Sequence, residues 1–194
     1  MNLQQLQEEY QGCQKCPLLV GNRTQVVFGS GSPNVKIILL GEAPGASEDK
    51  LGVPFCGQSG KVLDILLQAA GLSRNEIFIT NTILCRPPNN RAPVSEEINN
   101  CHPRLETLLA IMQPRIIVTI GNFATQCILG KTGIKALHGK IFEHNGMKVV
   151  PVIHPANYLY SGRNPQLLEE MKQDFKVIAK VVADSQKQKT LGEF

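Results

Sequence analysis

Short runs of aliphatic and β-branched residues alternate with segments of helical periodicity along this chain. The strand-like runs cover residues 35–40, 77–81, 115–120 and 148–153. Such alternation is typical of α/β proteins, in which helices connect parallel strands and cover the sheet. We therefore expect a three-layer α/β/α sandwich around a central, mainly parallel, four-stranded sheet.

Two helical segments are predicted between these strands. Residues 61–70 show a helical pattern that ends at Gly71, and residues 96–112 show one that begins after Ser95, a residue type that caps helix N-termini. Pro103 lacks a backbone N–H and its ring clashes with the preceding turn. We therefore expect Pro103 to split the second segment into two short helices.

The C-terminal third is expected to contain a hairpin and a long helix. Asn145 and Gly146 both tolerate positive φ, so they predict a tight turn between strands at 140–144 and 148–152. Further on, apolar residues recur at helical spacing and predict a helix with one core-facing side. These residues are Leu167, Leu168, Met171, Phe175, Ile178 and Val182.

Composition indicates an ordinary folded protein. The 194 residues suit a single domain, residues 1–194, in which the mostly polar residues 185–194 are expected to form a flexible tail. Hydrophobic residues make up 42% of the chain and charged residues 19%, which excludes global disorder. The N-terminus lacks the pattern of a signal peptide, and no run approaches the roughly 20 apolar residues of a membrane span. We expect a cytoplasmic protein with no membrane contact.

The formal charge of +4 permits a polyanionic partner without requiring one.

Two glycine-containing segments resemble nucleotide-binding motifs but lack residues or positions that those motifs require. The segment 130–132 (GKT) lacks the first glycine of a P-loop, because residue 125 is Thr, and we expect it to form a helix-ending turn. The segment 29–31 (GSG) precedes a strand where a dinucleotide fingerprint would follow one, so we expect a loop.

The cysteines are better candidates for chemistry. Cys13 and Cys16 form a C-x-x-C pair, and Cys85 and Cys101 follow far downstream. Zinc sites most often use two close pairs, whereas a cubane cluster offers four separated iron corners that accept one pair and two scattered thiolates. The spacing therefore favours an iron-sulfur cluster over zinc, while free buried thiols and a redox-active pair remain alternatives.

Five segments, in order, carry a resemblance to a known family. They are residues 41–45 (GEAPG), 52–60 (GVPFCGQSG), 80–81 (TN), 85–93 (CRPPNNRAP) and 154–156 (HPA). Together they resemble the family 4 uracil-DNA glycosylases, from about Cys13 to the C-terminal helix. The resemblance implies a monomeric DNA-repair enzyme, associated with the nucleoid, that flips uracil out of single- or double-stranded DNA and hydrolyses its N-glycosidic bond. Free uracil and an abasic site would be the products.

The resemblance also implies a [4Fe-4S] cluster. Its ligands would be Cys13, Cys16, Cys85 and Cys101. The cluster would be structural, because hydrolysis needs no redox change. The remaining two thiols, Cys56 and Cys127, are expected to stay outside it.

The implied catalytic roles suit the residue types. Breaking the glycosidic bond places positive charge on the sugar and negative charge on uracil, so the site needs an anion on one side and a donor on the other. Glu42 would activate water and stabilise the sugar cation, and neutral His154 would donate to uracil O2. Asn81 would pair with N3–H and O4 of uracil, where cytosine presents the opposite pattern. Phe55 would stack on the flipped base.

Further contacts follow from the same resemblance. Gly41, Ala43 and Glu48 would also contact the substrate, since they belong to the glycine-rich segments that approach it. Each main site residue has a structural alternative as well: Phe55 could be a core residue, His154 a loop histidine and Asn81 a strand-end cap.

DNA contacts are expected on two loops. Arg86 and Arg91 flank a proline-rich turn and would contact phosphates. Tyr158 and Leu159 follow the His-Pro-Ala segment and would fill the vacated base stack. Residue 160 is Tyr, where the family tends to have Arg.

Neighbouring branches and one other class compete with this interpretation. Family 5 enzymes carry a nonpolar residue where Glu42 stands, and the uracil-crosslinking branch carries a basic insertion ending in His before the last cluster cysteine. Only PNNRAP stands at 88–93 here, which favours hydrolysis without a covalent intermediate. A non-catalytic or redox-sensing iron-sulfur protein that binds nucleic acid is the alternative from another class.

Overall fold

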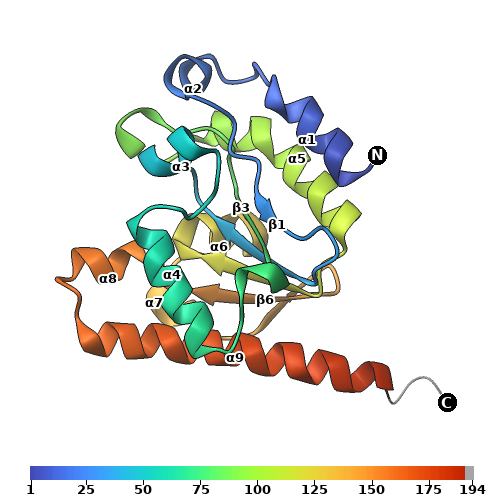
Figure 1. Ribbon diagram of the computed structural model, residues 1–194, viewed down its shortest axis with the longest axis vertical. Helices are drawn as coiled ribbons and strands as arrows, with labels where there is room; N and C mark the ends of the chain where they lie inside the picture. The colour runs from blue at the N-terminus through green and yellow to red at the C-terminus, as the bar shows by residue number, and fades with distance from the viewer. Residues whose placement is uncertain (191–194) are drawn as a thin grey trace.

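The computed structural model describes residues 1–190, which form a twisted sheet with helices on both sides (Figure 1). The strands are β1 (Ser30–Gly31), β2 (Ile37–Gly41), β3 (Phe78–Asn81), β4 (Ile116–Ile120), β5 (Phe142–His144) and β6 (Met147–Val152). The helices are α1 (Leu3–Gln11), α2 (Pro17–Asn22), α3 (Ala46–Leu51), α4 (Gln58–Ala69), α5 (Ser95–Met112), α6 (Gly121–Leu129), α7 (Ile134–Leu137), α8 (Ala156–Tyr160) and α9 (Pro165–Thr190). Two short 3-10 turns, η1 (Arg74–Glu76) and η2 (Pro88–Asn90), lie between them.

The predicted α/β architecture is confirmed, but the strand count differs. In the described residues the sheet has six strands in the order β1-β3-β2-β4-β6-β5. The four predicted strands are the parallel centre, and β1 and β5 add antiparallel edges. The sequence hides β1 because it is only Ser30–Gly31, where we expected a loop. Gly31 is required at this edge, because a Cβ there would lie 2.1 Å from the carbonyl oxygen of Ile77.

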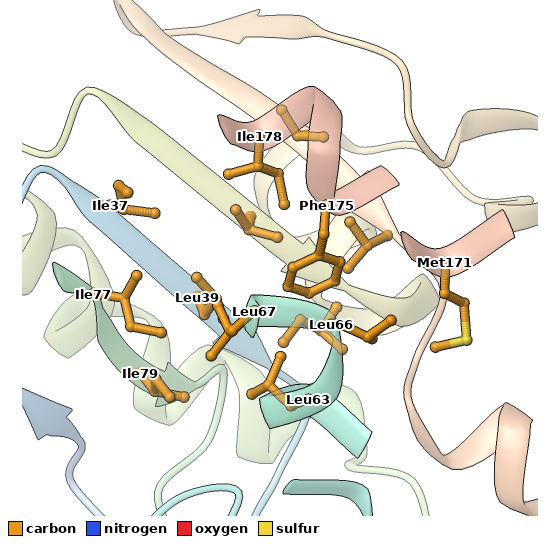
Figure 2. Close-up of a cluster of buried hydrophobic side chains, with 14 of the residues drawn as sticks. Ile37, Leu39, Leu63, Leu66, Leu67, Ile77, Ile79, Met171, Phe175 and Ile178 are labelled. Atoms are coloured by element: carbon orange, nitrogen blue, oxygen red, sulfur yellow. The ribbon is translucent and has the colours of Figure 1, made fainter. Parts of the chain in front are cut away.

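Alternating side chains of the central strands build two cores. On β2, Ile37 and Leu39 face one side, whereas Ile38 and Leu40 face the other. Figure 2 shows the first core, in which α4 and α9 pack against the sheet. The second core lies under α1, α5 and α6. The helices therefore form the outer two layers of a sandwich.

Helix α5 differs from the sequence prediction. It is one continuous helix with Pro103 inside it. Leu105 and Leu108 are buried in the second core, so packing of the C-terminal half offsets the hydrogen bond that proline cannot make. Thr107 Oγ1 donates to the carbonyl oxygen of Pro103 at 2.9 Å. The prediction of two short helices was wrong because tertiary packing overrides the local cost.

The C-terminal elements follow the prediction more closely. Asn145 (φ 48°) and Gly146 (φ 77°) form the turn between β5 and β6, so the hairpin is confirmed. Helix α9 continues to Thr190, so residues 185–190 are helical where a flexible tail was expected, and residues 191–194 lie outside the described part. Gly130 ends α6 with φ 66°, which confirms the helix-ending turn. No helix of the described residues is long and apolar enough to cross a membrane.

Leu66 on α4 provides a test of the first core. Its side chain is 0% exposed, whereas the neighbouring Ile65 is 44% exposed. We expect Leu66→Ala to lower the free energy of unfolding by about 2–5 kcal/mol, because it removes buried surface and leaves a cavity. Ile65→Ala, the matched control on the same helix, should cost less than about 1 kcal/mol. Urea denaturation measures both, and equal losses would contradict the assignment of Leu66 to the core.

Candidate functional site

A large cleft lies at the carboxyl ends of the parallel strands. Its volume is about 540 Å³. Glu42 follows β2, Asn81 ends β3, Gly121 follows β4, and His154 lies two residues past β6; all four line the cleft. Binding sites of open α/β sheets form at this edge, where loops from adjacent strands diverge. The structure therefore brings together the residues that the sequence separates by more than one hundred positions.

Gly41 holds the floor of the cleft open. In the parallel register of β2 and β3, Gly41 lies opposite Asn81. A Cβ at Gly41 would lie 2.3 Å from Asn81 Oδ1 and 2.8 Å from Phe55 Cε2. Only glycine at this position therefore lets the Asn81 amide and the Phe55 ring approach each other over the strand end.

The side chain of Asn81 has no hydrogen-bond partner among the described residues. Its residue is 2% exposed and lines the cleft. Its side-chain amide makes no hydrogen bond with any other described residue, whereas a strand-end cap would bond to nearby backbone. Buried amides require hydrogen-bond partners. The geometry therefore favours a ligand-binding amide over a structural cap.

Phe55 is held in a constrained conformation beside Asn81. Its φ is +50°, which is uncommon for a bulky residue. Arg74 Nη2 donates to its carbonyl oxygen at 2.7 Å, and a Cβ at Gly60 would lie 1.8 Å from that same oxygen. Its ring centroid lies 5.9 Å from that of His154 at an interplanar angle of 30°. Sequence reasoning missed Arg74, since nothing in the local pattern links it to Phe55.

Two independent features indicate that the imidazole of His154 is neutral and can donate a hydrogen bond. Protein around the ring desolvates the imidazolium and lowers the pKa of His154 to about 4, although the negative charge of Glu48 opposes this shift. The backbone N–H of Ala156 donates to Nδ1 at 3.1 Å. Because Nδ1 accepts, the single proton of the neutral ring sits on Nε2. That nitrogen is a hydrogen-bond donor at neutral pH.

Two carboxylates complete the polar lining. Burial raises the pKa of Glu42, which makes its carboxylate a stronger base than an exposed one. Thr82 fixes the backbone beside it by donating from Oγ1 to the Glu42 carbonyl oxygen at 2.5 Å. Glu48 Oε1 accepts from the N–H of Gly57 at 2.9 Å, so it joins α3 to the start of α4 at the cleft wall. Ala43 also lines the cleft.

The four predicted cluster cysteines meet away from the cleft. Together they line one pocket beneath α1, α2 and α5, and the lining does not include the remaining two cysteines, Cys56 and Cys127. The pocket's four thiols belong to Cys13, Cys16, Cys85 and Cys101. No group of three or more His, Cys, Asp or Glu side chains among the described residues is arranged to hold a metal ion. Four thiols around one pocket are nevertheless the ligand set that a cubane iron-sulfur cluster uses.

Donors surround these sulfurs. Arg23 Nη1 donates to Cys85 Sγ at 2.9 Å and Nη2 to the carbonyl oxygen of Cys13 at 2.6 Å. Asn100 Nδ2 lies 3.6 Å from Cys16 Sγ. Hydrogen bonds from cationic and amide groups stabilise thiolates rather than neutral thiols. These donors therefore suit thiolates at Cys85 and Cys16.

The predicted DNA contacts divide into two groups. Arg91 lines the cleft but makes a double hydrogen bond to Glu97 at 2.6 and 2.9 Å, which lowers the pKa of Glu97. Arg86 bonds through Nε to Asn90 Oδ1 at 2.7 Å. The charge of Arg91 is therefore already paired with a carboxylate, whereas Arg86 bonds to a neutral amide.

The loop after His154 presents a residue that was not predicted to contact DNA. Tyr158 and Leu159 are partly buried and pack against the first core, so their role in the base stack stays a prediction. Tyr160, at the end of α8, is 87% exposed and lines the cleft. The exposure of this aromatic ring at the cleft suggests a contact with a ligand. Exposure is a property of the folded structure, so the sequence alone could not indicate it.

The protonation of His154 can be followed directly. A histidine with its pKa lowered to about 4 stays neutral down to that pH, whereas an exposed ring protonates near 6.5. Because the unfolded chain binds the proton first, this residue reduces stability as pH falls from about 6.5 toward 4. NMR of ¹⁵N-histidine protein, assigned with His154→Gln, should show a neutral Nε2–H ring across this range. Titration of that signal near pH 6.5 would contradict the buried donor.

Comparison with known proteins identifies the family of this chain. The sequence model of the Uracil DNA glycosylase superfamily matches residues 28–176. A type-4 uracil-DNA glycosylase of Sulfurisphaera tokodaii is 41% identical, over 91% of this chain and 83% of its own length. The type-4 uracil-DNA glycosylase of Archaeoglobus fulgidus is 39% identical over 100% and 98% of the two chains. A type-5 uracil-DNA glycosylase of Mycobacterium leprae is only 28% identical, over 92% and 96%.

The resemblance found in the sequence motifs is thus confirmed by matches over nearly the whole chain. This chain belongs to the uracil-DNA glycosylase superfamily, and within it to the type-4 uracil-DNA glycosylases.

Proposed function

We propose that this protein removes uracil from DNA by hydrolysing the N-glycosidic bond, leaving an abasic site. One observation carries the proposal: Glu42, Phe55, Asn81 and His154 line the same cleft at the carboxyl edge of the sheet. The matched relatives are named for this activity.

Base selection falls to Asn81 and Phe55. The free amide of Asn81 accepts from uracil N3–H and donates to O4, and cytosine would leave both groups unpaired in a buried place. The ring of Phe55 stacks on the flipped base, because its strained backbone fixes it beside Asn81. Gly41 and Ala43 leave room for the base, and Glu48 holds the cleft wall through Gly57.

Bond cleavage falls to His154 and Glu42. As the bond breaks, negative charge grows on uracil O2, and the Nε2–H of neutral His154 donates to it. Glu42 accepts a proton from the attacking water, for which its raised pKa is favourable, and its negative charge stabilises the sugar cation. Water attacks the sugar, so no covalent bond to the protein forms.

The polymer is held at the cleft mouth. Arg91 lines the cleft, but Glu97 already pairs with it, so the guanidinium charge of Arg86 is the more available of the two for a phosphate. The exposed ring of Tyr160 offers a stacking surface for a neighbouring base, with Tyr158 and Leu159 behind it. We propose that the protein acts as a monomer on uracil-containing single- or double-stranded DNA, in the cytoplasm at the nucleoid.

We further propose that Cys13, Cys16, Cys85 and Cys101 hold a [4Fe-4S] cluster. When bound, the cluster supplies a rigid link between the N-terminal segment and the segments before and within α5. The hydrogen bonds from Arg23 and Asn100 to the sulfurs support this assignment. The reaction itself needs no electron transfer.

Release of free uracil from a uracil-containing oligonucleotide tests the activity. We expect wild type to release the base and His154→Ala to do so about 10²–10³-fold more slowly, because it loses the donor to the developing oxyanion. Asn81→Ala should also lose uracil selection. As a control, a thymine-containing oligonucleotide should stay intact.

Two results would contradict the proposed activity. A wild-type protein that leaves uracil attached over a range of salt and temperature would favour the non-catalytic iron-sulfur alternative. A protein-DNA adduct that resists denaturation would contradict hydrolysis by water.

The cluster has its own measurement. We expect purified protein to contain about four iron and four sulfide per chain and to absorb broadly near roughly 400 nm. Cys101→Ser should lower iron content, whereas Cys127→Ser, outside the pocket, should not. Stoichiometric zinc in a colourless protein would be incompatible with the assignment.

A further inference from the structure

A fully buried arginine lies between the cysteine pocket and the base-reading strand. Arg104 on α5 is 0% exposed. Its Nη2 donates to the carbonyl oxygens of Asn81 at 2.7 Å and Thr82 at 3.1 Å, and lies 3.9 Å from Cys101 Sγ. Its Nη1 donates to Thr80 Oγ1 at 3.3 Å. One guanidinium therefore touches three consecutive residues at the end of β3 and one cysteine of the pocket.

This guanidinium lacks an obvious counterion. Among the described residues Arg104 forms no ion pair with a carboxylate, and its Nε has no hydrogen-bond partner. Arginine stays protonated in proteins, and a buried charge is costly unless an anion compensates it. Two thiols lie beside this charge: Cys101, whose Sγ is 3.9 Å from Nη2, and Cys127, which Arg104 influences electrostatically. A thiol carries negative charge only as a thiolate. A cluster with four thiolate ligands would supply that charge.

The contact matters because of what Asn81 does. Its side-chain amide makes no hydrogen bond within the described residues, so its position depends on its own backbone and on packing against Gly41 and Phe55. Arg104 bonds to that backbone at the residue itself and at the next one. Movement of the arginine would therefore move the base reader.

We propose that Arg104 is a positioning residue that couples the cluster-bound thiolate of Cys101 to the backbone of Asn81. This inference rests on the proposed function, since it assumes that Asn81 reads uracil. The cluster would then do more than link distant segments of the chain. The negative charge of its thiolate ligands would hold Arg104 in the position from which it orients Asn81. Arg104 itself touches neither uracil nor the water.

Arg23 provides a matched control. It donates to Cys85 Sγ at 2.9 Å, closer than Arg104 lies to Cys101, and in the described part of the chain it makes no hydrogen bond to β3. Arg23→Gln and Arg104→Gln each remove one positive charge beside the cluster. Both should shift the reduction potential of the holoprotein to more negative values. Only Arg104→Gln should change uracil recognition.

The experiment measures three properties of iron-loaded wild type, Arg104→Gln, Arg104→Lys and Arg23→Gln. They are the reduction potential, the inhibition constant of free uracil, and the affinity for an oligonucleotide that carries thymine in place of uracil. We expect Arg104→Gln to bind free uracil about 10- to 100-fold more weakly while its affinity for the thymine oligonucleotide is unchanged. Arg104→Lys keeps the charge but not the two-carbonyl geometry, so it should keep the potential near wild type and still bind uracil more weakly.

The outcomes separate the two levels of inference. Wild type that releases no uracil overturns the proposed function and this role with it. Active wild type, together with Arg104 variants that bind uracil as tightly as wild type, overturns the role of Arg104 alone. If Arg104→Gln fails to take up iron, Arg104→Lys decides: iron-loaded protein with wild-type uracil binding overturns the proposal, and weaker binding supports it.

Discussion

The pairing of β2 with β3 is the constraint on which the site depends. The parallel register sets Gly41 opposite Asn81, and the missing side chain of Gly41 admits the Asn81 amide and the Phe55 ring into one small space. A shift of one residue would turn Asn81 to the opposite face of the sheet. The Asn81 side chain would then leave the cleft. Such a shift would also exchange the side chains that pack in the two cores, so the packing of both cores opposes it.

Burial at this edge has opposite effects on two titratable groups. It raises the pKa of Glu42 and lowers that of His154, because a low-dielectric environment disfavours the charged form of each. The carboxylate becomes a better proton acceptor and the imidazole stays a neutral donor. One physical cause thus accounts for both shifts, and neither residue forms an ion pair within the described residues. The two states are those that the proposed cleavage would use.

Sequence patterns predicted the parts of this molecule that depend on local chemistry. The central strands, the Asn145-Gly146 turn and the end of α6 follow from side-chain pattern and backbone preference. The family motifs also indicated the four residues that line the cleft. The continuity of α5 through Pro103 was not predictable, because packing of its C-terminal half decides it.

Residues that act through tertiary contacts were missed for a related reason. Arg74 supports Phe55 from η1 and belongs to no recognisable motif. Gly60 ends the motif at 52–60, but its close approach to the Phe55 carbonyl oxygen was not predicted. Tyr160 looked like a departure from the family pattern, and only its exposure at the cleft suggests a contact with DNA. Arg104 would be read from sequence as a surface charge in a helix, since arginine is rarely buried.

Asn81 is reached from both faces of the sheet, which explains why its surroundings are so restricted. From the first core, Phe55 packs beside its amide; from the second, Arg104 bonds to its carbonyl oxygen. The side chain makes no hydrogen bond with another described residue, so its amide oxygen and nitrogen are both available to a ligand. Fixing the backbone instead keeps the amide available and still limits its movement. A buried cation lowers stability unless an anion compensates its charge. The Sγ atom of Cys101 lies 3.9 Å from Nη2, and as a thiolate it would be that anion.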